Sequence, residues 1–383
     1  RYDDAAWQQA ASARVAHAYM RRDRVMPYLI HNYAHNQEWC VRSLMKVGRA
    51  QDAIRLAMNL TELPRHPKFN TFDKSSSCPS YGRRRLFDVA LDYELWNQLV
   101  ELTDSPYLEP TDLPLEQAKR LHARSLAFFR LGNSTQATAE MQQLQAMLDT
   151  VVAERDAAVA KARAEFESGE NEPDADKSDA DEPDADKDDD DDQKTDDQTD
   201  ADESDESSSD DDRMKALRRA ERRAAKAFEG RRKSFTVYLD ELAAWKQLDE
   251  GHLEEAAEVF QQNKQIPRGR RVLGLLACGE ADAACEIAKD GLKSSDNQVL
   301  PLALYVEALH AANRSDDASQ AFAQLREIAA QVDLESPIFA RITRIAAGFG
   351  EPLDWRPAAV ARDDVGRRPD LDDLGPFAWT PVA

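Results

Sequence analysis

The sequence predicts an all-α protein, an irregular solenoid of helical hairpins with a long helical stalk that a disordered acidic loop interrupts. Apolar residues recur three and four positions apart through nearly every segment outside that loop, the period of a helix face packed on a core. The strict alternation of a half-buried strand is absent, and residues 235–238 are the nearest approach to one. With 383 residues, the chain is long enough for two or three domains.

Five predicted turns share one pattern, a Gly or Asn followed five residues later by Ala. A tight turn between antiparallel helices needs a residue that tolerates positive φ, and the Ala allows the second helix to approach the first closely. In three cases a bulkier residue stands four positions after the Ala, where it would fill the groove between helices. The five pairs are Gly48 with Ala53, Gly132 with Ala137, Gly251 with Ala256, Gly279 with Ala284, and Asn313 with Ala318.

Composition divides the chain into six segments. A stripe of Met, Leu and Val marks a long helix, a basic helix follows the acidic tract, and five Pro residues interrupt the pattern near the end. The long helix and the basic helix are expected to pair as an antiparallel stalk. The segments are an N-terminal helical-repeat domain (1–133), the long helix (134–167), the acidic tract (168–212), the basic helix (213–233), C-terminal repeats (234–349) and a linker toward a further domain (350–383).

Net charge is concentrated in the acidic tract. Residues 168–212 hold 24 acidic residues and 3 Lys, a balance of −21 out of −22 for the whole chain. A segment with so much charge and so few apolar residues cannot bury enough surface to order itself, so disorder is expected there. The near-neutral remainder argues against a basic nucleic-acid-binding protein, and the tract would compete in cis for the basic helix. No apolar run reaches the roughly 18 residues of a membrane span.

The helix expected after Pro27 carries the first group of candidate site residues. His31, His35 and Glu38 are four and three residues apart, so they share a helical face and could offer two imidazoles and a carboxylate to zinc or iron. We favour the alternative, in which aromatic and imidazole side chains pack on a neighbouring helix or line a groove for a peptide. The residues of that surface are Tyr28, His31, Tyr33, His35 and Trp39.

The second group begins at Cys78. Tyr81 precedes Arg83, Arg84 and Arg85, and such a cluster could clamp a phosphate or carboxylate, although solvated Arg in a first helical turn is the interpretation we favour. The same Arg residues could lower the pKa of Cys78 and make it a reactive thiol, which we consider the weaker hypothesis. The remaining pair, Cys278 and Cys285, is better explained by packing than by redox pairing.

Several stretches resemble the N-terminal region of large bacterial proteins that combine tetratricopeptide repeats with a redoxin domain. The distance from Gly279 to Asn313 is 34 residues, the tetratricopeptide period, whereas Gly251 to Gly279 is 28. The closing Trp379-Thr380-Pro381-Val382-Ala383 resembles the phrase that precedes the first strand of alkyl hydroperoxide reductase and thiol-specific antioxidant proteins. The other stretches are IHNYAHN (30–36), GRAQDAIRLA (48–57), ELPRHPKFN (62–70) and YGRRRL (81–86).

The resemblance implies a parent protein with peroxide-reducing or thiol–disulfide activity in a bacterial cytoplasm or periplasm. It places no catalytic residue in this chain, because the thioredoxin-like core and its active-site Cys are absent from the sequence. The function predicted for the chain is therefore a protein-interaction module that binds a protein or peptide, for example a redoxin domain in cis. No cofactor, nucleic acid or membrane span is expected. The alternative is an enzyme fragment with its own site, either a metal on His31, His35 and Glu38 or a reactive Cys78.

Overall fold

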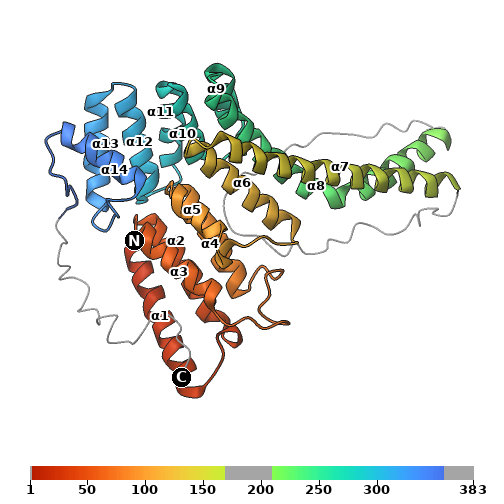
Figure 1. The fold of residues 1–383 in the computed structure, drawn as a ribbon, viewed down its shortest axis with the longest axis horizontal. Helices are drawn as coiled ribbons and strands as arrows, with labels where there is room; N and C mark the ends of the chain where they lie inside the picture. Colours follow the sequence, from red (N-terminus) through yellow and green to blue (C-terminus); the bar gives the residue numbers. More distant parts are fainter. Residues whose placement is uncertain (1, 169–208, 358–383) are drawn as a thin grey trace, which may run out of the picture. The chain divides into compact units, whose positions relative to one another are not determined.

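The computed structural model describes residues 2–168 and 209–357, and all the regular secondary structure in this part of the chain is helical. It contains fourteen α-helices and two short 3₁₀-helices and no strand, which confirms the all-α class (Figure 1). None of the helices within these residues is long and apolar enough to cross a membrane.

Two long helices separate an N-terminal from a C-terminal series of shorter ones. Neighbouring helices pack on one another through most of each series, and α2 with α4, α10 with α12, and α12 with α14 also make contact. The N-terminal series is α1 (Tyr2–Asp23), the 3₁₀-helix η1 (Pro27–Leu29), α2 (His31–Lys46), α3 (Ala50–Glu62), α4 (Cys78–Asp92), α5 (Trp96–Thr103), the 3₁₀-helix η2 (Pro106–Leu108) and α6 (Pro114–Arg130). The long helices α7 (Ser134–Ser168) and α8 (Ser209–Asp249) are followed by α9 (Leu253–Gln262), α10 (Arg268–Cys278), α11 (Ala281–Leu292), α12 (Val299–Ala311), α13 (Ser315–Ile328) and α14 (Pro337–Gly348).

The chain forms two compact units, one of residues 1–147 with 234–383 and one of residues 148–233. In the second unit, Arg231 pairs with Glu154 at 3.7 Å and Arg163 pairs with Glu221 at 3.4 Å, so α7 and α8 run antiparallel there. The division between the units at 233/234 falls where the sequence places a segment boundary, and helix α8 continues through it without a break. Helices also include residue 168 and residues 209–212, which were expected to be disordered, and the rest of the acidic tract lies outside the described residues.

The five predicted turns are present as helix C-caps in the left-handed conformation. In each turn the following residue donates a backbone hydrogen bond back to the last turn of the helix, for example Arg49 N–H to the Leu44 carbonyl at 3.0 Å, and the Ala five residues later is fully buried. The prediction for these positions is therefore confirmed. Their φ values are +86° at Gly48, +74° at Gly132, +86° at Gly251, +84° at Gly279 and +57° at Asn313.

A sixth turn of the same kind lies at Glu94, between α4 and α5. Glu94 has φ of +57°, and Leu95 N–H donates to the Ala90 carbonyl at 2.9 Å. Its buried carboxylate pairs with Arg130 of α6 and with Arg341 of α14. The sequence pattern missed this turn because it was sought at Gly and Asn, and because Leu99 stands where the other turns have Ala.

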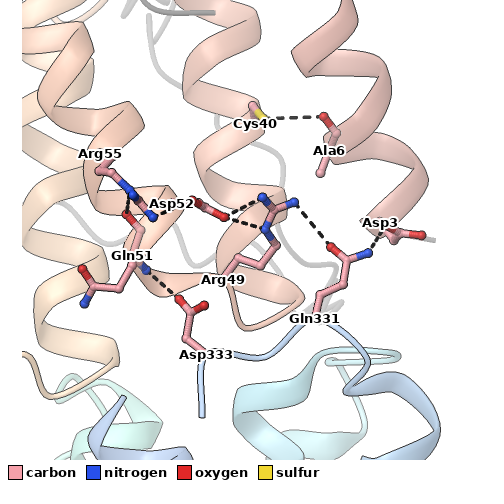
Figure 2. A network of polar contacts seen from close by, with 9 residues as sticks. All are labelled: Asp3, Ala6, Cys40, Arg49, Gln51, Asp52, Arg55, Gln331 and Asp333. Carbon is pink, nitrogen blue, oxygen red and sulfur yellow. Dashed lines mark hydrogen bonds and ion pairs between the residues drawn. The ribbon is translucent and has the colours of Figure 1, made fainter. Parts of the chain in front are cut away.

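The turn between α2 and α3 contacts the loop between α13 and α14, some 280 residues later. Gln51 N–H donates to the Asp333 carboxylate at 2.8 Å, and the two residues are 282 positions apart in sequence. Figure 2 shows this contact. In addition, Asp333 N–H donates to the Gly48 carbonyl at 2.9 Å. A Cβ on Gly48 would lie 2.6 Å from a methyl of Val332, so this turn needs glycine both for its φ and for the close approach. The N-terminal and C-terminal series are thereby joined within one unit.

Residues 350–357, which the sequence assigns to the linker, pack on the last two helices. Trp355 is 0 % exposed, its ring lies 5.3 Å from that of Phe322, and its indole N–H donates to the Thr343 hydroxyl at 2.9 Å. An aromatic ring with a satisfied N–H contributes strongly to a core. The helical unit therefore extends to at least residue 357, beyond the predicted end at 349.

Candidate functional site

A pocket of about 330 Å³ lies between the N-terminal and C-terminal series of helices. Helices α2 and α4 supply one wall, and α10, α11 and α12 with the segment after α11 supply the other. Both walls belong to the unit of residues 1–147 and 234–383. The volume falls within the ~300–1,000 Å³ that is usual for ligand pockets.

Helix α4 presents one basic and two acidic residues to the pocket. Arg85, Asp88 and Asp92 are three and four residues apart and therefore share a helix face. Arg85 pairs with the buried Glu38 of α2 and with Asp88 at 2.8 Å, and Lys119 of α6 approaches Asp88 at 3.3 Å. The first two side chains of this face are thus held in place by ion pairs.

The two carboxyls of this face have opposite pKa shifts. Burial disfavours the charged form of Asp88, but the cations Lys119 and Arg85 outweigh that effect and lower its pKa. Asp92 lines the pocket with an exposed side chain and has no ion pair among the described residues. Desolvation by the protein nearby, together with the charge of Asp88, raises the pKa of Asp92 to about 7. Asp92 therefore titrates near neutral pH.

A buried charged cluster continues behind this wall. Glu241 of α8 pairs with Arg270 of α10 at 2.7 Å and with the His122 Nε2 of α6 at 3.0 Å, and Tyr238 stacks on His122 with ring centroids 4.5 Å apart. Burial opposes ionisation of Glu241, but Arg270 and His122 lower its pKa overall, whereas burial lowers the pKa of His122. Near pH 7 the cluster thus holds a carboxylate, a guanidinium and a neutral imidazole.

Three cationic side chains line the pocket with weak or no ion pairing. Arg42 and Lys46 of α2 have no carboxylate partner in the part of the chain that the structure describes; Arg42 lies 5.0 Å from the Trp39 ring centroid and Lys46 lies 4.4 Å from that of Tyr2. Arg268 of α10 reaches Asp290 only at 3.5 Å, in an exposed pair. These three cations give the pocket a positive rim.

The opposite part of the pocket is apolar. Val272 of α10 and Leu300, Pro301 and Leu304 at the start of α12 line it. Gly291 of α11 also lines the pocket and lies against the Arg268 side chain, because a Cβ at this position would lie 2.8 Å from the Arg268 Cδ. The pocket thus combines a cationic rim with an apolar wall.

Of the residues predicted on the surface of α2, His35 and Trp39 form a stripe that continues to Arg42 at the pocket, whereas Tyr33 does not. His35 and Trp39 lie side by side with ring centroids 5.7 Å apart, and Trp39 is 45 % exposed next to Arg42. Tyr33 is 0 % exposed and packs with Met20, Leu60 and Cys78, so its assignment to a groove is wrong. A residue two positions from His35 points to the opposite side of the helix, which explains the error.

The other residues predicted on or near this surface lie apart from the pocket. The Tyr28 ring is 5.2 Å from that of His66, and Tyr81 packs on the core around Tyr33. His31 is the first residue of α2, and its side chain lies outside what the structure describes. Glu38 is committed to Arg85 and is therefore not an open metal ligand. Within the described residues, no group of three or more His, Cys, Asp or Glu is arranged to hold a metal ion.

The Arg triplet diverges to three different partners and does not form one clamp. Arg83 is 2 % exposed and pairs with Glu116 at 3.3 Å, Arg84 donates to the Ser75 carbonyl at 2.9 Å, and Arg85 faces the pocket. The favoured interpretation as solvated Arg is also wrong for Arg83, because α6 covers it. Of the triplet, Arg85 alone lines the pocket.

The cysteines are buried. Burial raises the pKa of Cys78 to about 11 despite hydrogen bonding that favours the thiolate, so the thiol is protonated at neutral pH. Burial also raises the pKa of Cys278 to about 11 and that of Cys285, and both are free thiols in the packed interior, as the packing interpretation predicts.

Most of the pocket residues were not predicted from the sequence, although the spacing of residues along α2 gave one signal. Arg42 and Lys46 continue the stripe from His35 and Trp39 at spacings of four, three and four. The opposite wall comes from residues 268–304, and no local pattern indicates that it meets α2 and α4.

Searches with protein-family models, among curated proteins and among solved structures find no match for this chain.

Proposed function

We propose that this chain is a helical-repeat protein-interaction module of the tetratricopeptide-like solenoid type. Six turns with the same left-handed cap and a buried residue five positions later support a repeated hairpin unit. Contacts between alternate helices, α2 with α4 and α10 with α12, are those expected when hairpins stack.

The pocket is the binding site in this proposal, and the observation that carries it is the pairing of a cationic rim with an apolar wall in one concavity. Peptide-binding surfaces commonly combine pockets for apolar side chains with a few polar groups that fix orientation. The exposed Trp39 beside Arg42 extends the surface beyond the pocket. The ion pairs of Arg85 and Asp88 hold the wall of α4 rigid, which reduces the entropy lost on binding.

A redoxin domain in cis is the partner that the sequence resemblance suggests. The support for this part is the residue pattern described above, including the closing segment 379–383. A titration of the chain with a purified domain of the alkyl hydroperoxide reductase type tests it, with binding expected in wild type and lost when the pocket is filled.

A peptide display library tests the proposed module without assuming a partner. Leu300→Trp fills the pocket from its apolar wall, and Leu253→Trp places the same side chain on the exposed start of α9. Peptides selected on wild type are expected to bind Leu253→Trp equally and Leu300→Trp at least tenfold more weakly. Peptides indifferent to Leu300→Trp would show that the pocket is not the binding site.

A further inference from the structure

Some of the charged side chains that line the pocket have carboxylate partners and others do not, and this difference indicates the charge of the ligand. The Arg85 guanidinium already has two carboxylate partners, whereas Arg42 and Lys46 have none in the described structure and Arg268 has one distant, exposed partner. A concave surface between low-dielectric walls concentrates the field of such cations. An anionic group placed among them would gain charge-assisted hydrogen bonds.

The apolar wall restricts the ligand further. Val272, Leu300 and Leu304 line the same pocket, and a small inorganic anion would leave them in contact with water. A segment with an acidic residue next to an apolar one satisfies both parts of the lining. Charge and shape together thus favour an acidic, partly apolar peptide.

The charge state of Asp92 affects how tightly such an acidic ligand can bind. Asp92 lines the pocket with no ion pair in the described residues, so a carboxylate bound at the rim would face a like charge whenever Asp92 is ionised. Protonation removes this repulsion. The charged groups around Asp92 are Arg42 and Lys46 from α2, Arg85 and Asp88 from α4, Lys119 from α6, and Arg268 and Arg270 from α10, and the lining of α11 and α12 adds none.

We propose that the pocket binds an acidic–apolar peptide segment and that binding is coupled to proton uptake by Asp92. The proposal rests on the proposed function and specifies the ligand class and its regulation. Because unliganded Asp92 titrates at about 7, its ionised form dominates above neutral pH and competes with the ligand. Affinity is then highest in mildly acidic solution and falls by up to about tenfold per pH unit above pH 7.

Fluorescence anisotropy with four labelled decapeptides tests the ligand class on the full chain. The peptides alternate Asp with Leu, Asn with Leu, Lys with Leu, and Asp with Ser. The Asp–Leu peptide is expected to bind at least tenfold more tightly than the other three, and more weakly as salt is raised. Equal binding of the Asn–Leu peptide would overturn the role of charge, and equal binding of the Asp–Ser peptide would overturn the role of the apolar wall and favour an acidic segment such as the chain's own tract.

Two double variants test whether the Asp–Leu peptide binds in the pocket. The double change Arg42→Gln with Lys46→Gln is expected to weaken the Asp–Leu peptide at least tenfold, whereas the matched double change Lys264→Gln with Lys289→Gln, on exposed Lys residues outside the pocket lining, leaves its affinity within twofold. A larger effect of the second pair would show that net charge alone governs binding. If peptides selected on the pocket bind regardless of their charge, the inference fails and the proposed function stands; if Leu300→Trp changes no peptide's affinity, the proposed function itself fails.

Proton uptake is measured by titration calorimetry in buffers of different ionisation enthalpy. At pH 7 wild type is expected to take up about half a proton per peptide bound, and Asp92→Asn none. Asp92→Asn should also bind with an affinity that hardly changes between pH 6 and 8. An unchanged pH profile in Asp92→Asn would overturn the role of Asp92.

Discussion

The two compact units use charged side chains in different ways. In the unit of residues 148–233 the pairs between α7 and α8 are at least partly open to solvent, as in Arg163 with Glu221, and the buried apolar residues among those described are Val151 and Leu217. In the other unit Glu241 is completely buried with its cation. Exposed pairs are screened and contribute little, whereas a buried ion must keep its partner. The difference shows that a high proportion of charged residues says little about stability until burial is known.

The largest expected effect is a loss of stability when a buried Glu of helix α8 is replaced by Gln, and the same replacement at a second position of α8 is its comparison. Glu241→Gln leaves Arg270 without its buried carboxylate and should lower the free energy of unfolding by about 3–5 kcal/mol. Glu221→Gln removes only a partly exposed partner of the exposed Arg163 and should cost about 0–1 kcal/mol. Denaturant unfolding of both variants measures the two changes, and equal losses would contradict the comparison.

Three glycine substitutions compare close packing with open surface. Gly48→Ala adds a Cβ that would lie 2.6 Å from Val332 at a positive φ, and should cost about 2–4 kcal/mol. Gly132→Ala has the positive φ alone, with no atom within 4 Å of the added Cβ, and should cost about 1 kcal/mol. Gly230→Ala lies within α8 in the 148–233 unit with no neighbour and should stabilise by about 0.5–1 kcal/mol. Thermal unfolding ranks the three, and any other order would contradict this account.

The pH dependence of stability tests the raised pKa of Asp92. Its pKa in the folded protein is raised to about 7, so the folded state holds its proton more tightly than the unfolded state and stability falls as pH rises from about 4 to about 7. Asp92→Asn removes this loss, so its melting temperature should exceed that of wild type by an amount that grows over this range and is constant above it. A gain equal at pH 4 and pH 8 would exclude titration of Asp92 as its source.

The smallest effect is expected in thiol reactivity. All four cysteines are buried, and burial raises the pKa of Cys40 to about 12 and that of Cys78 to about 11. An aromatic disulfide reagent at pH 8 should therefore label the native protein slowly and label four thiols at once in denaturant. Rapid labelling of Cys78 in the native protein would revive the hypothesis of a reactive thiol.

Local features of the fold could be predicted from the sequence, and contacts between remote segments could not. The turns at Gly48 and Gly279 were predictable because a left-handed cap has few acceptable residues, whereas the turn at Glu94 was missed because Glu rarely takes this conformation. The contact of Glu94 with Arg341 of α14 has no local signal either. On α2, the periodicity identified the stripe of His35 and Trp39 but not which face was buried, hence the error at Tyr33. The pocket depends on residues 268–304 meeting α2 and α4, which chain order alone does not reveal.

The contact between Gln51 and Asp333 has a consequence for synthesis on the ribosome. The two residues are 282 positions apart, and at ~5–20 residues per second translation needs roughly 15–55 s to cover that interval. Through this time the α2–α3 turn has emerged while its partner loop does not yet exist. Arg49 and Gln51, which hydrogen-bond residues 331 and 333 in the folded chain, have only water as partner there until those residues are made, and the pocket is completed only when the last third of the chain has been made.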